Sequence, residues 1–305
     1  MDWLDRARAL LGERKEEDLP SLPTPDREGR GDGVHYFEYG LSTDSPATVV
    51  FVHGFTLAAS AWFMQVEAVA PHARCLAVDL RGHGETGRWP VPECTITGAA
   101  DDVLTALTHA GVDGPLVFVG HSLGGMVVMN LLRRYPDLRA RVQSVILVST
   151  AVDSIASQGI PQVLALPIVE KIRDAAEASP KDVARFRKRI SRLVAPTLAT
   201  TVFQTPLPTS VINFHAKLIH STPLDTYVGF LDELQSHNEV EGAQALRGIK
   251  GVVMVGTRDA VTEPEQSERI AELWGCGLQF ARDAGHMLIF EQPALVNKAI
   301  LSALR

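Results

Sequence analysis

Short apolar runs of strand length recur along most of this chain, and segments with helical periodicity separate them. Each run is continuous rather than alternating, so a strand formed from it is buried on both faces, as is typical of a parallel sheet covered by helices. The runs expected to form strands are residues 48–52, 75–78, 116–119, 144–148, 252–255 and 278–280. The helices expected between them are residues 58–70, 96–110, 123–134 and 264–274. This repeated order predicts an α/β fold with a doubly wound, mostly parallel sheet.

Three parts of the chain differ in pattern, and they set the expected domain boundaries. Residues 34–152 and 245–305 carry the strand and helix alternation and form the predicted core, which a chain of 305 residues at 46% hydrophobic can bury. Residues 153–244 have the pattern of several short helices punctuated by prolines, which predicts a helical cap inserted into the core. Residues 1–33 combine an apolar helical pattern with a proline-rich and glycine-rich stretch, which predicts an N-terminal helix and linker.

The overall charge and composition bound the class of partner. A formal net charge of −7 provides no general positive field for phosphate backbones, which argues against nucleic-acid binding and favours a small-molecule substrate. The cysteines at 75, 94 and 276 are odd in number and have no paired spacing, so we expect them to be reduced in a cytoplasmic protein. The first residues have no apolar run long enough for a signal peptide or a membrane span, so no integral membrane segment is expected. Peripheral contact with a membrane, through the N-terminal helix or the basic stretch 181–192, stays open as an alternative.

The strongest chemical motif is Gly120-His121-Ser122-Leu123-Gly124, which has the form G-x-S-x-G. It directly follows an expected strand and precedes an expected helix, and this context gives the motif its meaning. The sharp turn strains the backbone at the serine, and glycines are needed on both sides because a Cβ there would collide with neighbouring backbone. Ser122 is therefore the candidate nucleophile, at the carboxyl edge of the sheet.

A serine hydroxyl needs a base to activate it and an acid to orient that base. Asp259 follows the expected strand 252–255, and His286 follows the last expected strand, so both lie at the same edge of the sheet as Ser122. We predict that His286 is the base and Asp259 the acid. Asp153, which follows the preceding strand, is the alternative acid, although a helix cap or a solvated surface residue is its simpler interpretation.

Two backbone N–H groups are expected to form an oxyanion hole. One strand ends in His53-Gly54-Phe55, and the turn at Gly54 can direct the N–H of Phe55 into the site. The N–H of Leu123, at the start of the helix after the serine, would be the second donor. Backbone donors leave no side-chain signature, so this assignment rests on position. The histidines near the site, including His53, are expected to be scaffold residues, because no pair has metal-ligand spacing.

The chain resembles the serine hydrolases of the α/β-hydrolase superfamily, among them esterases and lipases with a helical cap. The resemblance runs from about residue 34 to the C-terminus and rests, in chain order, on His53-Gly54, Gly120-His121-Ser122-Leu123-Gly124-Gly125, Asp259 and Gly285-His286. Residues 79–84 also resemble the family's loop after its fourth strand. The resemblance implies hydrolysis through an acyl-enzyme and a cap inserted after the sixth strand. This mechanism requires no cofactor and no metal.

These motifs predict cleavage of a carboxylic ester, and the apolar side chains of the cap favour a hydrophobic acyl or alcohol group. Thioesterases, amide and lactone hydrolases, acyltransferases and cofactor-free perhydrolases of the haloperoxidase type share the machinery and stay open as alternatives. Epoxide hydrolases and haloalkane dehalogenases of the family use an aspartate nucleophile, whereas this chain has a serine there. A ligand-binding receptor on a hydrolase scaffold is the alternative from another class, and repeated turnover distinguishes an enzyme from it.

Overall fold

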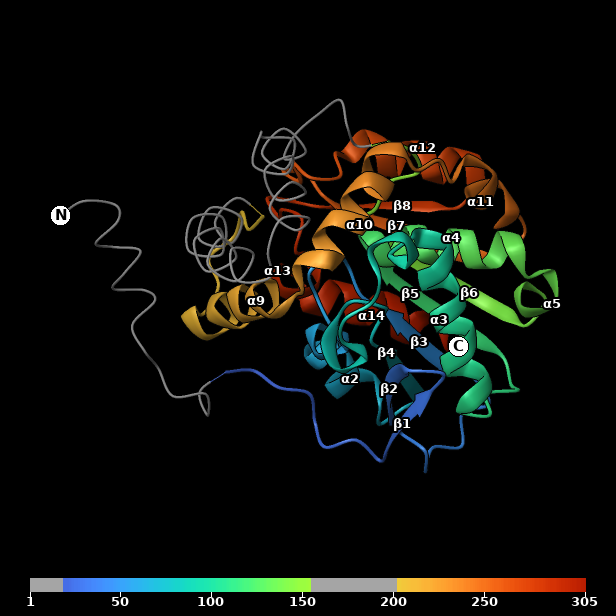
Figure 1. The fold of residues 1–305 in the computed structure, drawn as a ribbon. Helices are drawn as coiled ribbons and strands as arrows, with labels where there is room; N and C mark the ends of the chain where they lie inside the picture. The colour runs from blue at the N-terminus through green and yellow to red at the C-terminus, as the bar shows by residue number, and fades with distance from the viewer. Residues whose placement is uncertain (1–18, 155–201) are drawn as a thin grey trace.

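The computed structural model describes residues 19–154 and 202–305 (Figure 1). Within these ranges, eight strands form one sheet in the order β1-β2-β4-β3-β5-β6-β7-β8. The strands are β1 (Arg27–Gly31), β2 (Val34–Tyr39), β3 (Thr48–Val52), β4 (Arg74–Val78), β5 (Leu116–His121), β6 (Val142–Val148), β7 (Lys250–Gly256) and β8 (Gly277–Ala281). β2 is antiparallel to both of its neighbours, and the strands from β4 to β8 in this order run parallel. The predicted mostly parallel sheet is confirmed.

The strand order creates a switch point near the middle of the sheet. The chain passes from β3 to its neighbour β4 and then returns to the other side of β3 to form β5. In open α/β sheets, ligands bind beyond the carboxyl ends of the strands at such a point. β3 ends at Val52, just before Gly54, and β5 ends at His121, just before Ser122. Two of the predicted site segments therefore leave adjacent strands at this switch point.

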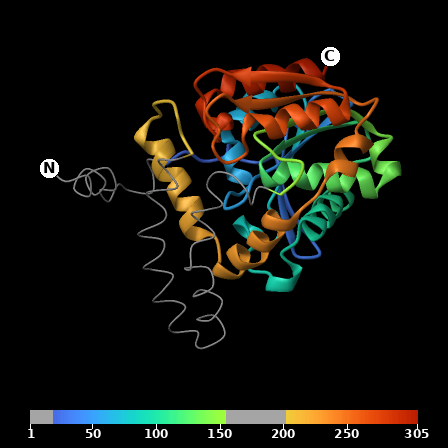
Figure 2. The same ribbon diagram turned by 90° about the horizontal axis from the view of Figure 1, so that it is seen from above.

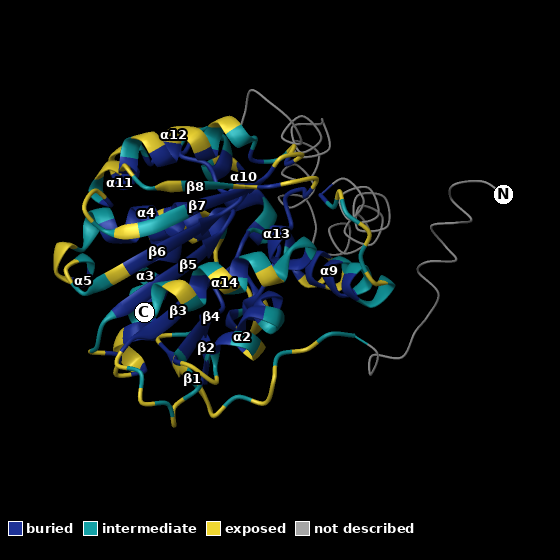
Figure 3. Ribbon diagram, turned by 180° about the vertical axis from the view of Figure 1, so that it is seen from behind, coloured by how far each residue is buried: buried dark blue, intermediate teal, exposed yellow. Residues whose placement is uncertain are grey.

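Helices cover both faces of the sheet (Figure 1). One face carries α3 (Ile96–His109), α4 (Leu123–Arg134), α11 (Val240–Ala245) and α12 (Pro264–Trp274), and the other carries α2 (Phe63–Val69), α13 (Leu288–Glu291) and α14 (Pro293–Ala303). The short elements are η2 (Ala59–Trp62), η3 (Gly84–Thr86), η4 (Val91–Glu93) and α5 (Pro136–Arg139). Seen from behind, the strands are buried between helices whose outer sides are exposed (Figure 3). The fold is thus three layers, with one apolar core on each side of the sheet.

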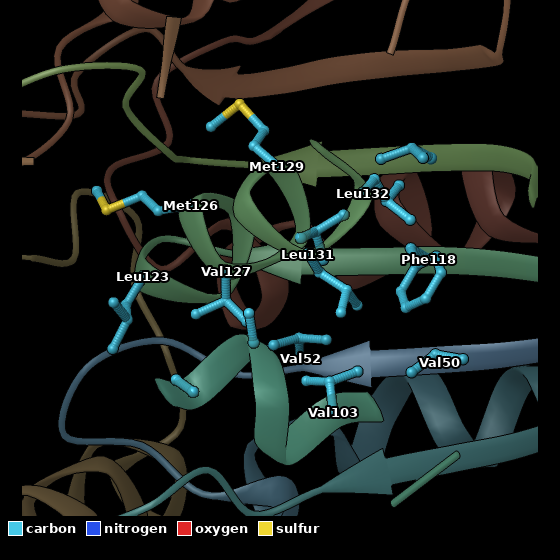
Figure 4. Close-up of a cluster of buried hydrophobic side chains, with 14 of the residues drawn as sticks. Val50, Val52, Val103, Phe118, Leu123, Met126, Val127, Met129, Leu131 and Leu132 are labelled. Atoms are coloured by element: carbon cyan, nitrogen blue, oxygen red, sulfur yellow. The ribbon is translucent and has the colours of Figure 1, made fainter. Parts of the chain in front are cut away.

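Burial of the strands on both faces follows from their continuous apolar sequence. Successive residues of β3 alternate between the two cores, so that Val50 packs on one side of the sheet and Phe51 on the other, both with no exposed surface. In the first core, Val50 of β3 and Phe118 of β5 lie beside Val127 and Leu131 of α4 (Figure 4). Because α4 begins directly after Ser122, this packing fixes the position of the turn that carries the serine.

The sheet extends two strands further toward the N-terminus than the expected strands, because β2, at the start of the predicted core, and β1 both precede residues 48–52. Residues 27–31, within the segment expected to be linker, form β1 and pair with β2. Asp32 and Gly33 make the connecting turn with positive φ angles of 46° and 88°, the two-residue hairpin turn that an Asp-Gly pair favours. β1 has no apolar run because it is an edge strand rich in charged residues, so hydrophobic periodicity cannot detect it.

Two described helices lie wholly within the predicted cap segment, α9 (Thr209–Ser221) and α10 (Leu224–Ser236), while α11 begins within it and packs against α4 and α12 of the core. Seen from above, α9 and α10, in yellow and orange, flank the sheet on one side (Figure 2). α10 is tied to the core by the Thr226 hydroxyl, which donates a hydrogen bond of 2.9 Å to the carbonyl oxygen of Gly82. That residues 153–244 form a separate helical cap domain remains a prediction.

Two predicted segments lie outside the described residues. They are the N-terminal helix within residues 1–18 and the basic stretch 181–192 of the cap. In the two ranges that are described, no helix combines the length and the apolar character needed to cross a membrane.

Candidate active site

Ser122 lies on the sharp turn between β5 and α4, and its backbone is strained. Its φ and ψ angles are 53° and −121°, a conformation that residues with a Cβ rarely adopt. Two hydrogen bonds to the backbone of Ser122 stabilise this conformation. The Ser122 N–H donates to the carbonyl oxygen of Val148 (3.0 Å), and the Thr150 hydroxyl donates to the Ser122 carbonyl oxygen (2.7 Å). The end of β6 therefore supports the turn.

Neighbouring atoms pack tightly around the three glycines predicted for these turns, backbone around Gly120 and Gly124 and the side chains of His121 and Ser122 beside Gly54. A Cβ added to Gly124 would overlap the carbonyl oxygen of Val52, and one added to Gly120 would lie 2.7 Å from the carbonyl oxygen of Gly124. A Cβ on Gly54 would lie 3.1 Å from the Cβ of Ser122. Glycine at these positions lets the turn after β3 and the turn after β5 approach each other, which places Gly54 beside the serine.

Ser122, His286 and Asp259 come from three separate loops at the carboxyl edge of the sheet and meet in a hydrogen-bonded chain. The Nε2 atom of His286 lies 3.1 Å from the Oγ of Ser122. The Nδ1 atom of His286 lies 3.1 Å and 3.0 Å from the two carboxylate oxygens of Asp259. All three residues are buried, and Ser122, at 9% exposed, is the most accessible. The geometry suits proton transfer from the serine to the imidazole.

The Asp259 carboxylate is buried but well supplied with donors. Its Oδ1 accepts hydrogen bonds from the backbone N–H groups of Val261 (2.9 Å) and Thr262 (3.0 Å), and its Oδ2 accepts one from the Thr262 hydroxyl (3.0 Å). Burial tends to raise the pKa of Asp259, but the neighbouring His286 and these donors outweigh it and hold the pKa below its usual range. The residue is therefore ionised next to His286.

Asp153, the alternative acid, has other partners. Its carboxylate accepts a hydrogen bond of 2.9 Å from the side-chain amide of Gln266 and forms an ion pair with Arg269, both on α12. Its backbone forms an isolated bridge with Asn238. These contacts join the beginning of the predicted cap segment to its end and to α12. Among the described residues, only Asp259 is a carboxylate with a hydrogen bond to His286.

The two predicted oxyanion donors are available for hydrogen bonding. No described residue accepts a hydrogen bond from the N–H of Phe55 or of Leu123. Phe55 follows Gly54 directly, and Leu123 is the first residue of α4, so the positive end of this helix dipole lies at the serine. Both N–H groups belong to turns that meet at Ser122, so they are suitable donors for a negatively charged oxygen.

The histidines near the site are scaffold residues in this arrangement. The His53 Nε2 accepts a hydrogen bond from the Leu80 N–H (3.1 Å), and the His83 Nε2 accepts one from the Thr56 N–H (3.2 Å). His121 Nε2 donates to the backbone carbonyl oxygen of the catalytic candidate His286 (3.0 Å), so it ties the serine turn to the histidine loop. In the described part of the chain, no group of three or more potential metal ligands is arranged to hold a metal ion.

Buried histidines make the stability of the fold depend on pH. Burial lowers the pKa of His83, His121 and His215 to about 3. In the unfolded chain these groups titrate near about 6.5, so unfolding takes up protons between the two values and the unfolding free energy falls as the pH falls. The slope is up to about 1.4 kcal/mol per histidine per pH unit. His35, whose pKa is raised by hydrogen bonds to carboxylates against the effect of its burial, acts in the opposite direction.

We expect urea denaturation to give a smaller unfolding free energy at about pH 5 than at about pH 7.5, a range above that in which most carboxylates titrate. In the variant His215→Gln, the unfolding free energy should depend less steeply on pH, by up to about 1.4 kcal/mol per pH unit, the contribution of one histidine. Equal unfolding free energies at the two pH values would contradict the assignment of these histidines as neutral in the folded state.

Aromatic side chains of α9 and α10 pack against the loops that carry the site. Phe55, at the oxyanion position, contacts Tyr227 of α10 edge to face with a centroid separation of 5.3 Å. Phe214 of α9 contacts Phe290, four residues after His286, with a centroid separation of 6.2 Å. α10 therefore packs against the loop that carries Phe55, and α9 packs against α13, the short helix that follows His286.

Comparison with known proteins shows the family of the chain. The model of the Alpha/beta hydrolase family matches residues 49–299, which include Ser122, Asp259 and His286. The chain belongs to the alpha/beta hydrolase family. Its sheet and helices are those of the alpha/beta hydrolase fold.

Individual relatives match parts of this alpha/beta hydrolase. Lipase LipV of Mycobacterium tuberculosis is 34% identical over 147 residues, which is 48% of this chain and 49% of that protein. A protein assigned as a carbamate hydrolase, RutD, from Agrobacterium fabrum is 30% identical over 109 residues, which is 36% of this chain and 41% of that protein. The chain thus spans less than half of the length of these curated relatives.

Solved structures match over nearly the whole chain. A thermophilic esterase from Thermogutta terrifontis is 26% identical with a TM-score of 0.71, and the match covers 94% of this chain and 97% of that one. The enol-lactonase from Burkholderia xenovorans is 23% identical with a TM-score of 0.72, covering 91% of this chain and 99% of that one. The second likeness shows the shared fold alone.

Proposed function

We propose that this alpha/beta hydrolase cleaves carboxylic esters through an acyl-enzyme formed on Ser122. The observation that carries the proposal is the hydrogen-bonded chain from the Ser122 Oγ to His286 Nε2 (3.1 Å) and from His286 Nδ1 to Asp259 (3.0 Å). Asp259 accepts a hydrogen bond from the Nδ1–H group of His286, which keeps the ring proton on Nδ1 and leaves the lone pair of Nε2 free to receive the serine proton. The likeness to a lipase and an esterase supports the same bond type.

The reaction follows from this arrangement. The Ser122 Oγ attacks the ester carbonyl carbon while its proton passes to His286 Nε2, and the carbonyl oxygen becomes a tetrahedral oxyanion. The carbon–oxygen bond to the alcohol then breaks, and the alcohol leaves with the proton from His286. A water molecule, deprotonated by His286, attacks the acyl carbon. The bond from that carbon to the Ser122 Oγ then breaks, the carboxylic acid leaves, and His286 returns the proton to Oγ.

The oxyanion would lie between the N–H groups of Phe55 and Leu123. Donors of this kind stabilise the transition state by about 2.7 to 4 kcal/mol each when they are held in place in advance. Neither amide has an acceptor in the described structure, so neither has to break a hydrogen bond when the oxyanion forms. The strained turn at Ser122 contributes by presenting the hydroxyl and the Leu123 amide together.

The aromatic contacts of α9 and α10 support a hydrophobic ester as substrate. Phe55, at the oxyanion position, contacts Tyr227, and Phe290, in the helix after His286, contacts Phe214, so apolar side chains of α10 and α9 pack against both loops and favour an apolar acyl or alcohol part. We propose a small molecule of this class as the partner. A serine at the nucleophile position favours ester chemistry over epoxide opening, although an epoxide hydrolase from Sus scrofa is also similar to part of this chain.

Steady-state hydrolysis of chromogenic acyl esters of increasing chain length tests this function. We expect repeated turnover of the wild-type protein, a preference for apolar acyl chains, and complete loss of turnover after treatment with a serine-directed phosphonate. A ligand-binding receptor would stop after about one equivalent of product. Turnover of thioesters with none of esters would move the assignment to thioester hydrolysis, and turnover that survives the phosphonate would overturn the serine mechanism.

A further inference from the structure

Thr262 is buried beside the acid and the base, and the sequence motifs do not reveal it. It lies in the loop between β7 and α12, and only 1% of its surface is exposed. Its hydroxyl donates a hydrogen bond of 3.0 Å to Oδ2 of Asp259, and the same oxygen lies 3.3 Å from Nδ1 of His286. The hydroxyl thus contacts both members of the pair, although none of the motifs identified in the sequence includes Thr262.

The two carboxylate oxygens of Asp259 are held in different ways. Oδ1 accepts two backbone N–H groups, from Val261 and Thr262, which remain in any side-chain variant. Oδ2 has no backbone donor among the described residues, and its partners are the Thr262 hydroxyl and His286. Without the hydroxyl, the carboxylate could turn about its Cβ–Cγ bond and leave the line to Nδ1, because only one oxygen would be anchored.

We propose that Thr262 is a positioning residue whose hydroxyl fixes the plane of the Asp259 carboxylate and so the alignment of His286. The inference rests on the proposed function, since alignment matters only if His286 acts as the base. Thr262 donates to Asp259, lies 3.3 Å from Nδ1 of His286 and has no hydrogen bond to Ser122 among the described residues, so it acts through the acid and the base and not on the nucleophile. A substrate bound at Ser122 is therefore not expected to sense Thr262 directly.

Two substitutions separate the hydroxyl from the rest of the side chain. Thr262→Val keeps a branched side chain of similar size and both backbone hydrogen bonds but removes the donor to Oδ2. We expect kcat for ester hydrolysis to fall about tenfold, the factor that one charge-assisted hydrogen bond supplies, with KM within about twofold of wild type. Thr262→Ser restores the hydroxyl and should bring kcat back to within about threefold of wild type.

A matched control distinguishes positioning from a general loss of a buried hydroxyl. Thr86 is a buried threonine whose hydroxyl also makes two hydrogen bonds, donating to the Asp79 carbonyl oxygen (2.6 Å) and accepting from the His35 N–H (2.8 Å). Thr86→Val should lower the melting temperature and leave kcat unchanged. In the proton NMR spectrum, the far-downfield signal of the His286 Nδ1 proton should shift or broaden in Thr262→Val and stay in place in Thr262→Ser and Thr86→Val.

The rate of covalent labelling by a serine-directed phosphonate keeps this inference separate from the proposed function, because labelling needs the activated serine but no natural substrate. If wild type is not labelled at Ser122, the proposed function fails. If wild type is labelled and Thr262→Val is labelled about tenfold more slowly, the inference holds. Equal labelling rates and equal kcat in wild type and Thr262→Val, or failure of serine to restore them, would overturn the role of Thr262.

Discussion

Replacing Ser122 with alanine should lower kcat for ester hydrolysis by about 10⁴-fold or more, with little change in the unfolding free energy. The substitution removes the only atom that lies within hydrogen-bond reach of His286 Nε2 among the described residues, so the acyl-enzyme cannot form. The backbone hydrogen bonds that hold the strained turn, from the Ser122 N–H and to its carbonyl oxygen, do not involve the side chain. The fold should therefore remain intact.

Steady-state kinetics and thermal unfolding of the same samples check this expectation. Ser267 offers a matched control, because it is fully buried on α12 and its hydroxyl has no hydrogen-bond partner in the described structure. Ser267→Ala should keep the wild-type kcat. An Ser122→Ala variant that is folded and retains more than about one tenth of the wild-type kcat would rule out Ser122 as the nucleophile.

Replacing Asp259 with asparagine should lower kcat by about 10⁴-fold through the tautomer of His286 rather than through the fold. The backbone N–H groups of Val261 and Thr262 both donate to Oδ1, so the asparagine carbonyl oxygen will occupy that position and its NH₂ group the Oδ2 position. The amide then donates to His286 Nδ1, which forces the ring proton onto Nε2. In that tautomer His286 cannot accept the proton of Ser122.

Asp153→Asn provides the comparison, since Asp153 is the competing acid in the sequence. It loses an ion pair with Arg269, whose side chain is 50% exposed, and we expect kcat within about threefold of wild type and only a small loss of stability. Measuring kcat of both variants at several pH values distinguishes a true loss of kcat from a shift of the pH–rate profile. The reverse result, a large loss in Asp153→Asn and none in Asp259→Asn, would show that the acid has been misassigned.

The fold was predictable because hydrophobic periodicity reports burial directly. Continuous apolar runs such as residues 48–52 are buried on both faces, and the observed β3 has the predicted bounds. β1 escaped prediction since an edge strand with alternating charges carries no such signal. Only the Asp32-Gly33 turn could have indicated the hairpin, and a two-residue turn is weak without an apolar strand on each side.

The residues of the candidate site differ in how far the sequence alone predicts them. Ser122 has a local signature, because the strained turn demands glycines at fixed spacing on both sides. Asp259 and Asp153 each follow a strand at the same sheet edge, and only the three-dimensional partners of each, His286 in one case and Arg269 in the other, distinguish them. Thr262 had no signal of its own, since a threonine three residues after an aspartate occurs in many loops.

The measurement that tests the central claim most directly is the mass of the protein during turnover. Wild type is mixed with a slowly hydrolysed chromogenic ester, quenched in acid after successive times, digested and analysed by mass spectrometry. We predict that one acyl group accumulates on the peptide that contains Ser122 within the first turnover and disappears when the substrate is exhausted. Steady turnover with no acylated peptide, or an acyl group on a different residue that forms and decays at the rate of turnover, would contradict the account.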